Sequence, residues 1–166
     1  MKASPYLVFN GNCIEAIKLY EKAFNTKATY CQYKDTPTNT NYPIQPGTEE
    51  FIMHAILPIG NCTIYLCDTT PDCKTIFGNG AFACIELDNE KAVKTAFEIL
   101  KEGGKVFCEA QETFWNKCYA ECEDKFGLKW SIMIEDKCTC TTECASGYNQ
   151  NCTCTICECN NQQTST

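Results

Sequence analysis

The chain lacks several features that would assign it to a familiar class. No run of apolar residues approaches the roughly 18 that a membrane span needs, and the N-terminal segment offers no apolar stretch long enough for a secretion signal. The formal charge is −7, and no cluster of Lys and Arg is present to bind phosphates. We therefore expect a soluble, cytoplasmic protein that binds neither nucleic acid nor membranes.

Common catalytic motifs are also missing. The sequence contains no Gly-rich phosphate loop, no His-Glu-x-x-His zinc motif and no nucleophile elbow. A Cys–His pair is formally available, because there are sixteen cysteines and one histidine, but nothing in the sequence places a particular thiol beside His54. These residues leave open whether the chain is an enzyme.

Cysteine, by contrast, is abundant, and it is distributed in two different ways. Nine cysteines are spread through the first 122 residues, several of them inside apolar runs. Free Cys packs as a small hydrophobe, and a chain of this length does not need disulfides to hold its core together. We expect these nine to be mostly reduced residues of the core.

The first half of the chain reads as a strand, a helix and three strands. Residues 4–10 are a short apolar run, and Asn12 then stands as a helix N-cap with Glu15 in the capping-box position. Further strands are expected at 27–33 and within the segments FIMHAILP and NCTIYLCD, which are joined by a tight turn.

The second half repeats this order. A strand precedes a helical stripe that ends near Gly103 and Gly104, and three more strands follow up to Glu135. Sliding the chain by 77 residues places Tyr20 on Phe97 and His54 on Ser131. This self-similarity predicts a duplicated α+β module.

The composition changes at Asp136. Residues 137–166 contain almost no large apolar side chains, so this tail cannot bury enough surface to fold unaided. We predict one domain over residues 1–136 and a tail over 137–166 that is disordered without metal.

Seven cysteines lie in the tail, and three readings of them stay open. Adjacent thiolates in Cys-x-Cys pairs suit soft ions such as Zn or Cu, disulfides are less favoured in a reducing cytosol, and the third reading is compositional drift. The candidate metal ligands are Cys138, Cys140, Cys144, Cys152, Cys154, Cys157 and Cys159.

Three segments carry a family likeness. PYLVFNGNCIEAIKLYEKAF, IMHAILPIGNCTIYLCD and ETFWNKCYAECEDKFGLKW resemble the PhnB-like branch of the vicinal oxygen chelate superfamily, which includes glyoxalase I, bleomycin-resistance proteins and extradiol dioxygenases. The resemblance covers residues 4–135. It implies paired βαβββ modules whose mixed sheet curls around a cavity for a small molecule, and a homodimer.

The same resemblance indicates which positions would bind a catalytic metal ion. Metal-dependent superfamily members hold an ion with four side chains, and motif matching puts those positions at Pro5, His54, Phe82 and Ser131. Only His54 is a good ligand, whereas a catalytic zinc normally takes three protein ligands. We therefore expect no metal or other cofactor in the cavity. The alternative, a metal-dependent lyase or dioxygenase, would require ligands that the sequence lacks.

Candidate ligand-binding residues follow from the predicted cavity. Strand alternation puts Ile52, His54 and Ile56 on one face, so His54 is either a cavity-facing general base or a buried neutral residue. Aromatic side chains would supply flat apolar walls, although Trp130 is as easily explained by core packing. The predicted substrate-binding set is Phe9, His54, Phe82, Trp115 and Trp130.

Overall fold

The computed structural model describes residues 3–37 and 43–135. The chain divides into two compact units, residues 1–134 and 135–166, and all regular structure that is described lies in the first. The predicted tail and its seven cysteines lie outside the described residues, so both remain predictions. No helix in the described part is long and apolar enough to cross a membrane.

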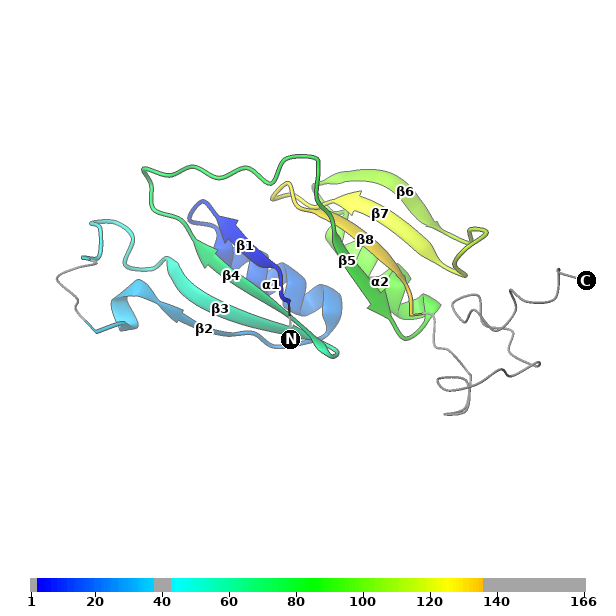
Figure 1. Cartoon of the computed structure of the whole chain (residues 1–166), viewed down its shortest axis with the longest axis horizontal. Helices are drawn as coiled ribbons and strands as arrows, with labels where there is room; N and C mark the ends of the chain where they lie inside the picture. Colours follow the sequence, from blue (N-terminus) through cyan, green and yellow to red (C-terminus); the bar gives the residue numbers. More distant parts are fainter. Residues whose placement is uncertain (1–2, 38–42, 136–166) are drawn as a thin grey trace, which may run out of the picture. The chain divides into compact units, whose positions relative to one another are not determined.

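The described chain runs strand, helix and three strands, twice over (Figure 1). Each repeat forms a four-stranded sheet, with strand orders β1-β4-β3-β2 and β5-β8-β7-β6. The elements of the first are β1 (Tyr6–Phe9), α1 (Cys13–Phe24), β2 (Thr29–Gln32), β3 (Ile52–Ile59) and β4 (Cys62–Asp68). Those of the second are β5 (Ala83–Leu87), α2 (Glu90–Leu100), β6 (Lys105–Gln111), β7 (Tyr119–Glu123) and β8 (Lys129–Ile134).

The predicted α+β class and the two βαβββ modules are confirmed. In each sheet the first strand lies parallel to the last one of its module, and the other pairs are antiparallel, so both sheets are mixed. In the part of the chain that the structure describes, the two sheets share no strand pairing and are not closed into a barrel. Among residues 3–37 and 43–135, therefore, each sheet keeps an open face opposite its helix.

The start of α1 differs from the predicted capping box. Asn12 makes no side-chain cap; its oxygen instead accepts a hydrogen bond from Asn10 N. The carboxylate of Asp68, at the end of β4, accepts hydrogen bonds from Gly11 N at 2.8 Å and Cys13 N at 3.0 Å. A negative charge at a helix N-terminus is favourable, so a residue from a distant strand supplies the cap.

The predicted equivalence of His54 and Ser131 is wrong. His54 lies on β3, whose counterpart in the second sheet is β7, whereas Ser131 lies on β8. The offset of 77 residues matches the helices but not the hairpins. The reason is that the connection from Gln32 to Ile52 is longer than the one from Gln111 to Tyr119.

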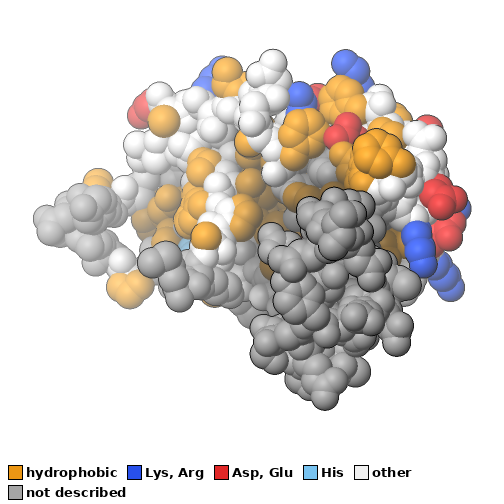
Figure 2. All heavy atoms as spheres, turned by 45° about the vertical axis from the view of Figure 1, so that its right-hand side comes forward, with side chains coloured by type: hydrophobic (Ala, Val, Ile, Leu, Met, Phe, Trp, Pro, Cys, Tyr) orange, Lys and Arg blue, Asp and Glu red, His pale blue; other side chains and the backbone are white. Residues whose placement is uncertain are grey.

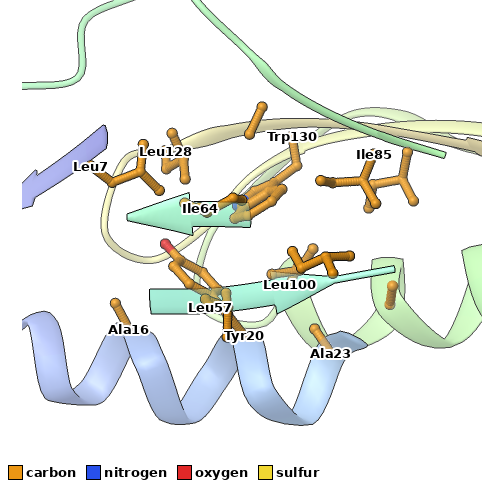
Figure 3. Packing of buried hydrophobic residues seen from close by; sticks show 14 of the residues in the cluster. Leu7, Ala16, Tyr20, Ala23, Leu57, Ile64, Ile85, Leu100, Leu128 and Trp130 are labelled. Carbon is orange, nitrogen blue, oxygen red and sulfur yellow. The ribbon is translucent and has the colours of Figure 1, made fainter. Parts of the chain in front are cut away.

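The core joins the two modules through a buried carboxylate. Asp124 follows β7 and is 2% exposed; its Oδ2 accepts hydrogen bonds from Tyr20 Oη at 2.7 Å and from Trp130 Nε1 at 2.8 Å. Its Oδ1 accepts the backbone N–H groups of Phe126 and Leu128. Figure 3 shows the Tyr20 ring rising from α1 into this core, in which its ring and that of Trp130 meet edge to face at 5.0 Å.

The nine cysteines of the described part are all free thiols, as predicted for the body of the chain. Their expected place in the core is right for only three: Cys13, Cys118 and Cys122 are buried, while Cys62, Cys73 and Cys84 are exposed and the rest are intermediate. Alternation explains Cys67 and Cys84, because every second residue of a strand points away from the helix, whereas Cys62 begins β4 and Cys73 lies in no strand.

Candidate functional site

Strand register decides which side chains lie on the open face of the first sheet. Tyr6 pairs with Tyr65, and Tyr65 pairs with Ile56, so these three share one face. Their neighbours along the strands, such as Leu66 and Ala55, are fully buried on the helix side. His54 is two residues from Ile56 and lies on the open face, as the alternation predicted.

His54 lies against two tyrosines. Its ring stacks on Tyr65 with centroids 5.5 Å apart, and Tyr6 lies 6.2 Å away. Partial burial is the main cause that raises the pKa of Tyr6 to about 12, and a hydrogen bond with the Cys67 thiol is the second cause. Tyr6 is therefore a neutral hydrogen-bonding group at physiological pH. His54 itself is half-buried, which places an imidazole at the surface of an aromatic patch.

The predicted partner of His54 on this face was Ile52, and that part of the alternation fails. Ile52 is fully buried, while the neighbouring Met53 is exposed. A register shift in β2 between Cys31 and Gln32, opposite this end of β3, interrupts the regular alternation.

The open face of the second sheet carries a hydrogen-bonded polar chain. Ser131 Oγ donates to Tyr119 Oη at 3.2 Å, and Tyr119 Oη donates to the Glu121 carboxylate. Partial burial, together with the bond to Glu121, raises the pKa of Tyr119 and keeps it protonated. Ser131 pairs with both Glu121 and Cys84 across the strands, so these groups form one row on the face.

Aromatic side chains border this polar row. The Trp115 ring meets Tyr119 edge to face at 5.6 Å and is 50% exposed; Phe114 beside it is 96% exposed. A half-exposed indole next to a carboxylate and two hydroxyl groups offers an apolar wall with adjacent polar partners. This combination is typical of small-molecule sites.

Phe82 lies elsewhere along the same sheet. It is half-exposed, and the ammonium of Lys129 lies 5.4 Å from its ring centroid and 5.2 Å from that of Phe107. Lys129 pairs with Glu123 at one end of the β7–β8 ladder, whereas Ser131 of the polar chain pairs with Glu121 two residues away. The structure thus places Phe82 on the open side but not in the cluster around Trp115.

Phe9 and Trp130 are core residues. Trp130 is 0% exposed, packs on Tyr20 and Phe24, and its indole N–H is taken by Asp124. Phe9 is 2% exposed and points to the helix side of its sheet. Of the five predicted substrate-binding residues, His54, Phe82 and Trp115 lie on open sheet faces, and these two do not.

Sequence reasoning missed Tyr119, Glu121, Tyr6 and Tyr65. The signal was available in the strands that contain them. In Tyr119–Glu123 the buried residues are Ala120 and Cys122, so the alternate positions had to face outward. The hydrogen bonds among them depend on the pairing of β7 with β8.

Metal ligation gains no support in the described part. Residues 3–37 and 43–135 contain no group of three or more His, Cys, Asp and Glu side chains arranged to hold an ion. Pro5 and Phe82 offer no side-chain ligand, and Ser131 is engaged with Tyr119. The predicted ligands of the tail lie outside the described residues.

Large apolar side chains remain exposed over much of the domain. The space-filling view in Figure 2 shows many of them across one face. Those on the open sides of the two sheets include Tyr6, Ile56, Phe82, Phe107 and Trp115. Apolar surface of this extent is typical of ligand or protein contact sites.

Comparison with known proteins supports the fold and identifies the family. The family model described as 3-demethylubiquinone-9 3-methyltransferase matches residues 1–133. Protein YjdN of Escherichia coli (strain K12) is 29% identical over 141 residues, covering 81% of this chain and 95% of the relative.

Two solved structures are similar over almost their whole length. Protein PA1353 from Pseudomonas aeruginosa is 27% identical with a TM-score of 0.71, covering 81% of this chain and 98% of that one. A putative 3-demethylubiquinone-9 3-methyltransferase, PhnB protein, from Bacillus cereus is 19% identical with a TM-score of 0.65, covering 81% and 100%. The chain therefore belongs to the family described as 3-demethylubiquinone-9 3-methyltransferase, that is, to the PhnB-like branch of the vicinal oxygen chelate superfamily.

Proposed function

We propose that this chain is a cytoplasmic small-molecule-binding protein whose ligand lies against the open faces of its sheets, without a complete catalytic metal site. The observation that carries the proposal is the cluster of Trp115, Tyr119, Glu121 and Ser131. It combines an exposed ring with a hydrogen-bonded carboxylate and hydroxyls on a face that no helix or strand among the described residues covers.

The His54 patch on the first sheet is proposed as a second contact area. The imidazole stacks on Tyr65, and the Tyr6 hydroxyl beside it stays protonated. This arrangement supplies hydrogen-bonding groups on an aromatic surface. A role for His54 as a general base is part of the proposal and depends on finding a substrate that brings a proton within its reach.

A homodimer is the arrangement that would enclose such a ligand. Open sheet faces with exposed Tyr6, Ile56, Phe82 and Trp115 are costly to leave in water, and a second copy can cover them. Light scattering on the reduced protein should give twice the chain's mass of 18.7 kDa. A monomer at micromolar concentration would contradict the dimer.

The binding proposal is tested by screening a small-molecule library for thermal stabilisation and titrating a hit by calorimetry. Trp115→Ala should lower the affinity for the hit compound about tenfold or more, because an aromatic wall of the site is lost. Glu121→Gln should lower the affinity for compounds that donate hydrogen bonds. Glu109→Gln is the matched control, since that carboxylate is exposed and pairs with Lys101. Hits that bind equally to the wild type and to Trp115→Ala would refute the site.

A metal-dependent lyase or dioxygenase of the same superfamily is the alternative. Such an enzyme holds its ion with several side chains, whereas the described residues bring no three ligands together. Added Zn, Ni or Fe should therefore produce no turnover with candidate substrates and no metal-dependent thermal shift in a chain whose tail cysteines are replaced by serine. Binding of one equivalent of metal by that variant, seen as a thermal shift, would support the alternative.

Soft-metal binding by the tail is a second proposed function, favoured by its seven cysteines in Cys-x-Cys and Cys-x-x-Cys spacings. The reduced full-length chain should carry several equivalents of Zn or Cu by mass spectrometry. The chain with all seven tail cysteines changed to serine should carry none. Equal metal content in both would remove the tail from consideration.

A further inference from the structure

A cavity of about 380 Å³ lies where the two modules meet. Three segments that are distant in the sequence line it: the end of β1 and the loop that follows, the connection between the modules, and the β7–β8 turn. Phe9, one of the substrate-binding residues predicted from the sequence, is among them, whereas the Trp115 cluster and the His54 patch are not. Its volume is within the range of small-ligand sites.

Aromatic rings form the walls of this junction cavity. Phe9 is buried beneath it, and the rings of Phe77 and Phe126 meet Phe9 edge to face at 5.3 Å and 5.9 Å. Phe77 and Phe126 are themselves half-buried, so each keeps some accessible surface. Rings gathered in this way attract cations through their electron-rich faces.

The loops around the cavity are tied together by side-chain hydrogen bonds. Asn10 Nδ2 donates to Thr75 O, and Thr75 N donates to Asn10 Oδ1, both at 2.9 Å. These paired bonds join the first loop of the chain to the connection between modules, 65 residues away. The cavity is thus held open before any ligand arrives, which lowers the entropic cost of binding.

Glu123 supplies a negative charge at the cavity. Its cross-strand neighbours are Lys129 and Lys105, but their ammonium groups lie over phenylalanine rings: Lys129 over Phe82 and Phe107, and Lys105 over Phe107. Among the ion pairs of the described residues, none includes Glu123. A carboxylate that lacks a counter-ion beside aromatic rings favours a cationic ligand.

We infer that the junction cavity binds a protonated amine that carries a small aromatic or alkyl group. The apolar group packs against Phe9, and the ammonium lies between the Phe77 ring and Glu123. The cavity already has a cation near it: Lys125 Nζ lies 5.1 Å from the Phe126 ring centroid. The ligand's ammonium is therefore expected on the side of Phe77, away from this lysine.

The test titrates benzylamine, with benzyl alcohol as the neutral analogue, into the reduced full-length chain and follows backbone amide shifts by NMR. Benzylamine should give saturable shifts at the cavity lining, and benzyl alcohol should bind at least about fivefold more weakly. Glu123→Gln should lower the affinity for benzylamine about fivefold. Glu98 is an exposed carboxylate on α2, and the Glu98→Gln variant should bind benzylamine as the wild type does.

The role of the rings is tested with Phe77→Leu, which keeps apolar volume and removes the aromatic face. This variant should bind benzylamine about threefold more weakly than the wild type does, and its affinity for benzyl alcohol should fall by less. Equal affinity for the two probes, or unchanged affinity in Glu123→Gln, would overturn the cation assignment. Shifts confined to residues outside the lining would overturn the site itself. Neither result would touch the open-face proposal, which rests on Trp115.

Discussion

The buried carboxylate of Asp124 is predicted to be the strongest single link between the two modules. Asp124→Asn keeps the shape of the side chain but replaces one acceptor oxygen by an NH₂ donor. Oδ2 now serves the Tyr20 hydroxyl and the Trp130 indole N–H, and Oδ1 serves two backbone amides. Whichever way the new amide turns, at least one buried N–H loses its acceptor.

The magnitude follows from those four hydrogen bonds. Hydrogen bonds to a charged group contribute roughly 1.5–3 kcal/mol each, and an orphaned buried donor costs a further 1–3 kcal/mol. The tyrosine hydroxyl can rotate to accept from the amide, but the indole N–H cannot. We expect Asp124→Asn to lower the free energy of unfolding by about 2–4 kcal/mol, measured by urea denaturation under reducing conditions.

Two controls separate this interaction from general damage. Asp72→Asn changes an exposed carboxylate and should stay within about 0.5 kcal/mol of the wild type. Tyr20→Phe removes one donor to Asp124, and its double-mutant cycle with Asp124→Asn should give a coupling energy of about 1–2 kcal/mol. A loss below about 0.5 kcal/mol in Asp124→Asn, or no coupling, would refute the bridging role.

Three further results are expected. Although burial raises the pKa of Glu21, the Ala28 amide and a lysine ammonium outweigh it and lower that pKa, so the carboxylate stabilises the fold above its unfolded pKa of about 4.3. Glu21→Gln should therefore cost about 1 kcal/mol at pH 7 and progressively less below pH 4 in urea titrations. Burial raises the pKa of Cys122 to about 12, so pulsed iodoacetamide should alkylate it far more slowly than exposed Cys62. Gly104→Ala should lose about 2 kcal/mol or more, because its Cβ would collide with a backbone carbonyl of β7.

Each of these has an outcome that would count against it. A Glu21→Gln deficit that grows as the pH falls would reverse the sign of the linkage. Equal alkylation rates at Cys122 and Cys62 would show that the second module opens readily in solution. Gly80→Ala is the control for the glycine prediction, since a Cβ there meets open space, and the two substitutions should differ clearly in melting temperature.

Local sequence pattern was sufficient for the elements of this fold. Helical spacing located α1 and α2, and strand alternation placed His54 and Ile56 on the face opposite Ala55 and Leu57. Both signals depend on neighbours within a few residues. Local hydrophobic pattern reflects burial directly, which is why these predictions were confirmed.

Contacts over long sequence distances could not be read in the same way. The hydrogen bond from Tyr20 to Asp124 spans 104 residues, and the one from Cys13 to Asp68 spans 55. An acidic residue after a strand gives no sign of which distant donors it will meet. The two tryptophans illustrate the same limit, since only the packing of α1 against Trp130 distinguishes the core ring from the exposed Trp115.

The repeat offset failed because equivalence was read from one constant shift. A longer connection before β3 changes the offset between helix and hairpin, and a shift of one residue moves a side chain to the other face. The polar chain of Ser131, Tyr119 and Glu121 was hidden for this reason. It could be seen only when the pairing of β7 with β8 was known.

The two indole N–H groups offer the most direct test of ligand binding on the open face. Trp115 is half-exposed beside Tyr119, whereas Trp130 is buried and bonded to Asp124, so one indole reports on the site and the other on the core. The measurement is a ¹H–¹⁵N NMR spectrum of the reduced chain with and without a saturating library hit. We predict that the Trp115 indole signal moves and that the Trp130 signal stays. A bound hit that leaves Trp115 unmoved would contradict this prediction.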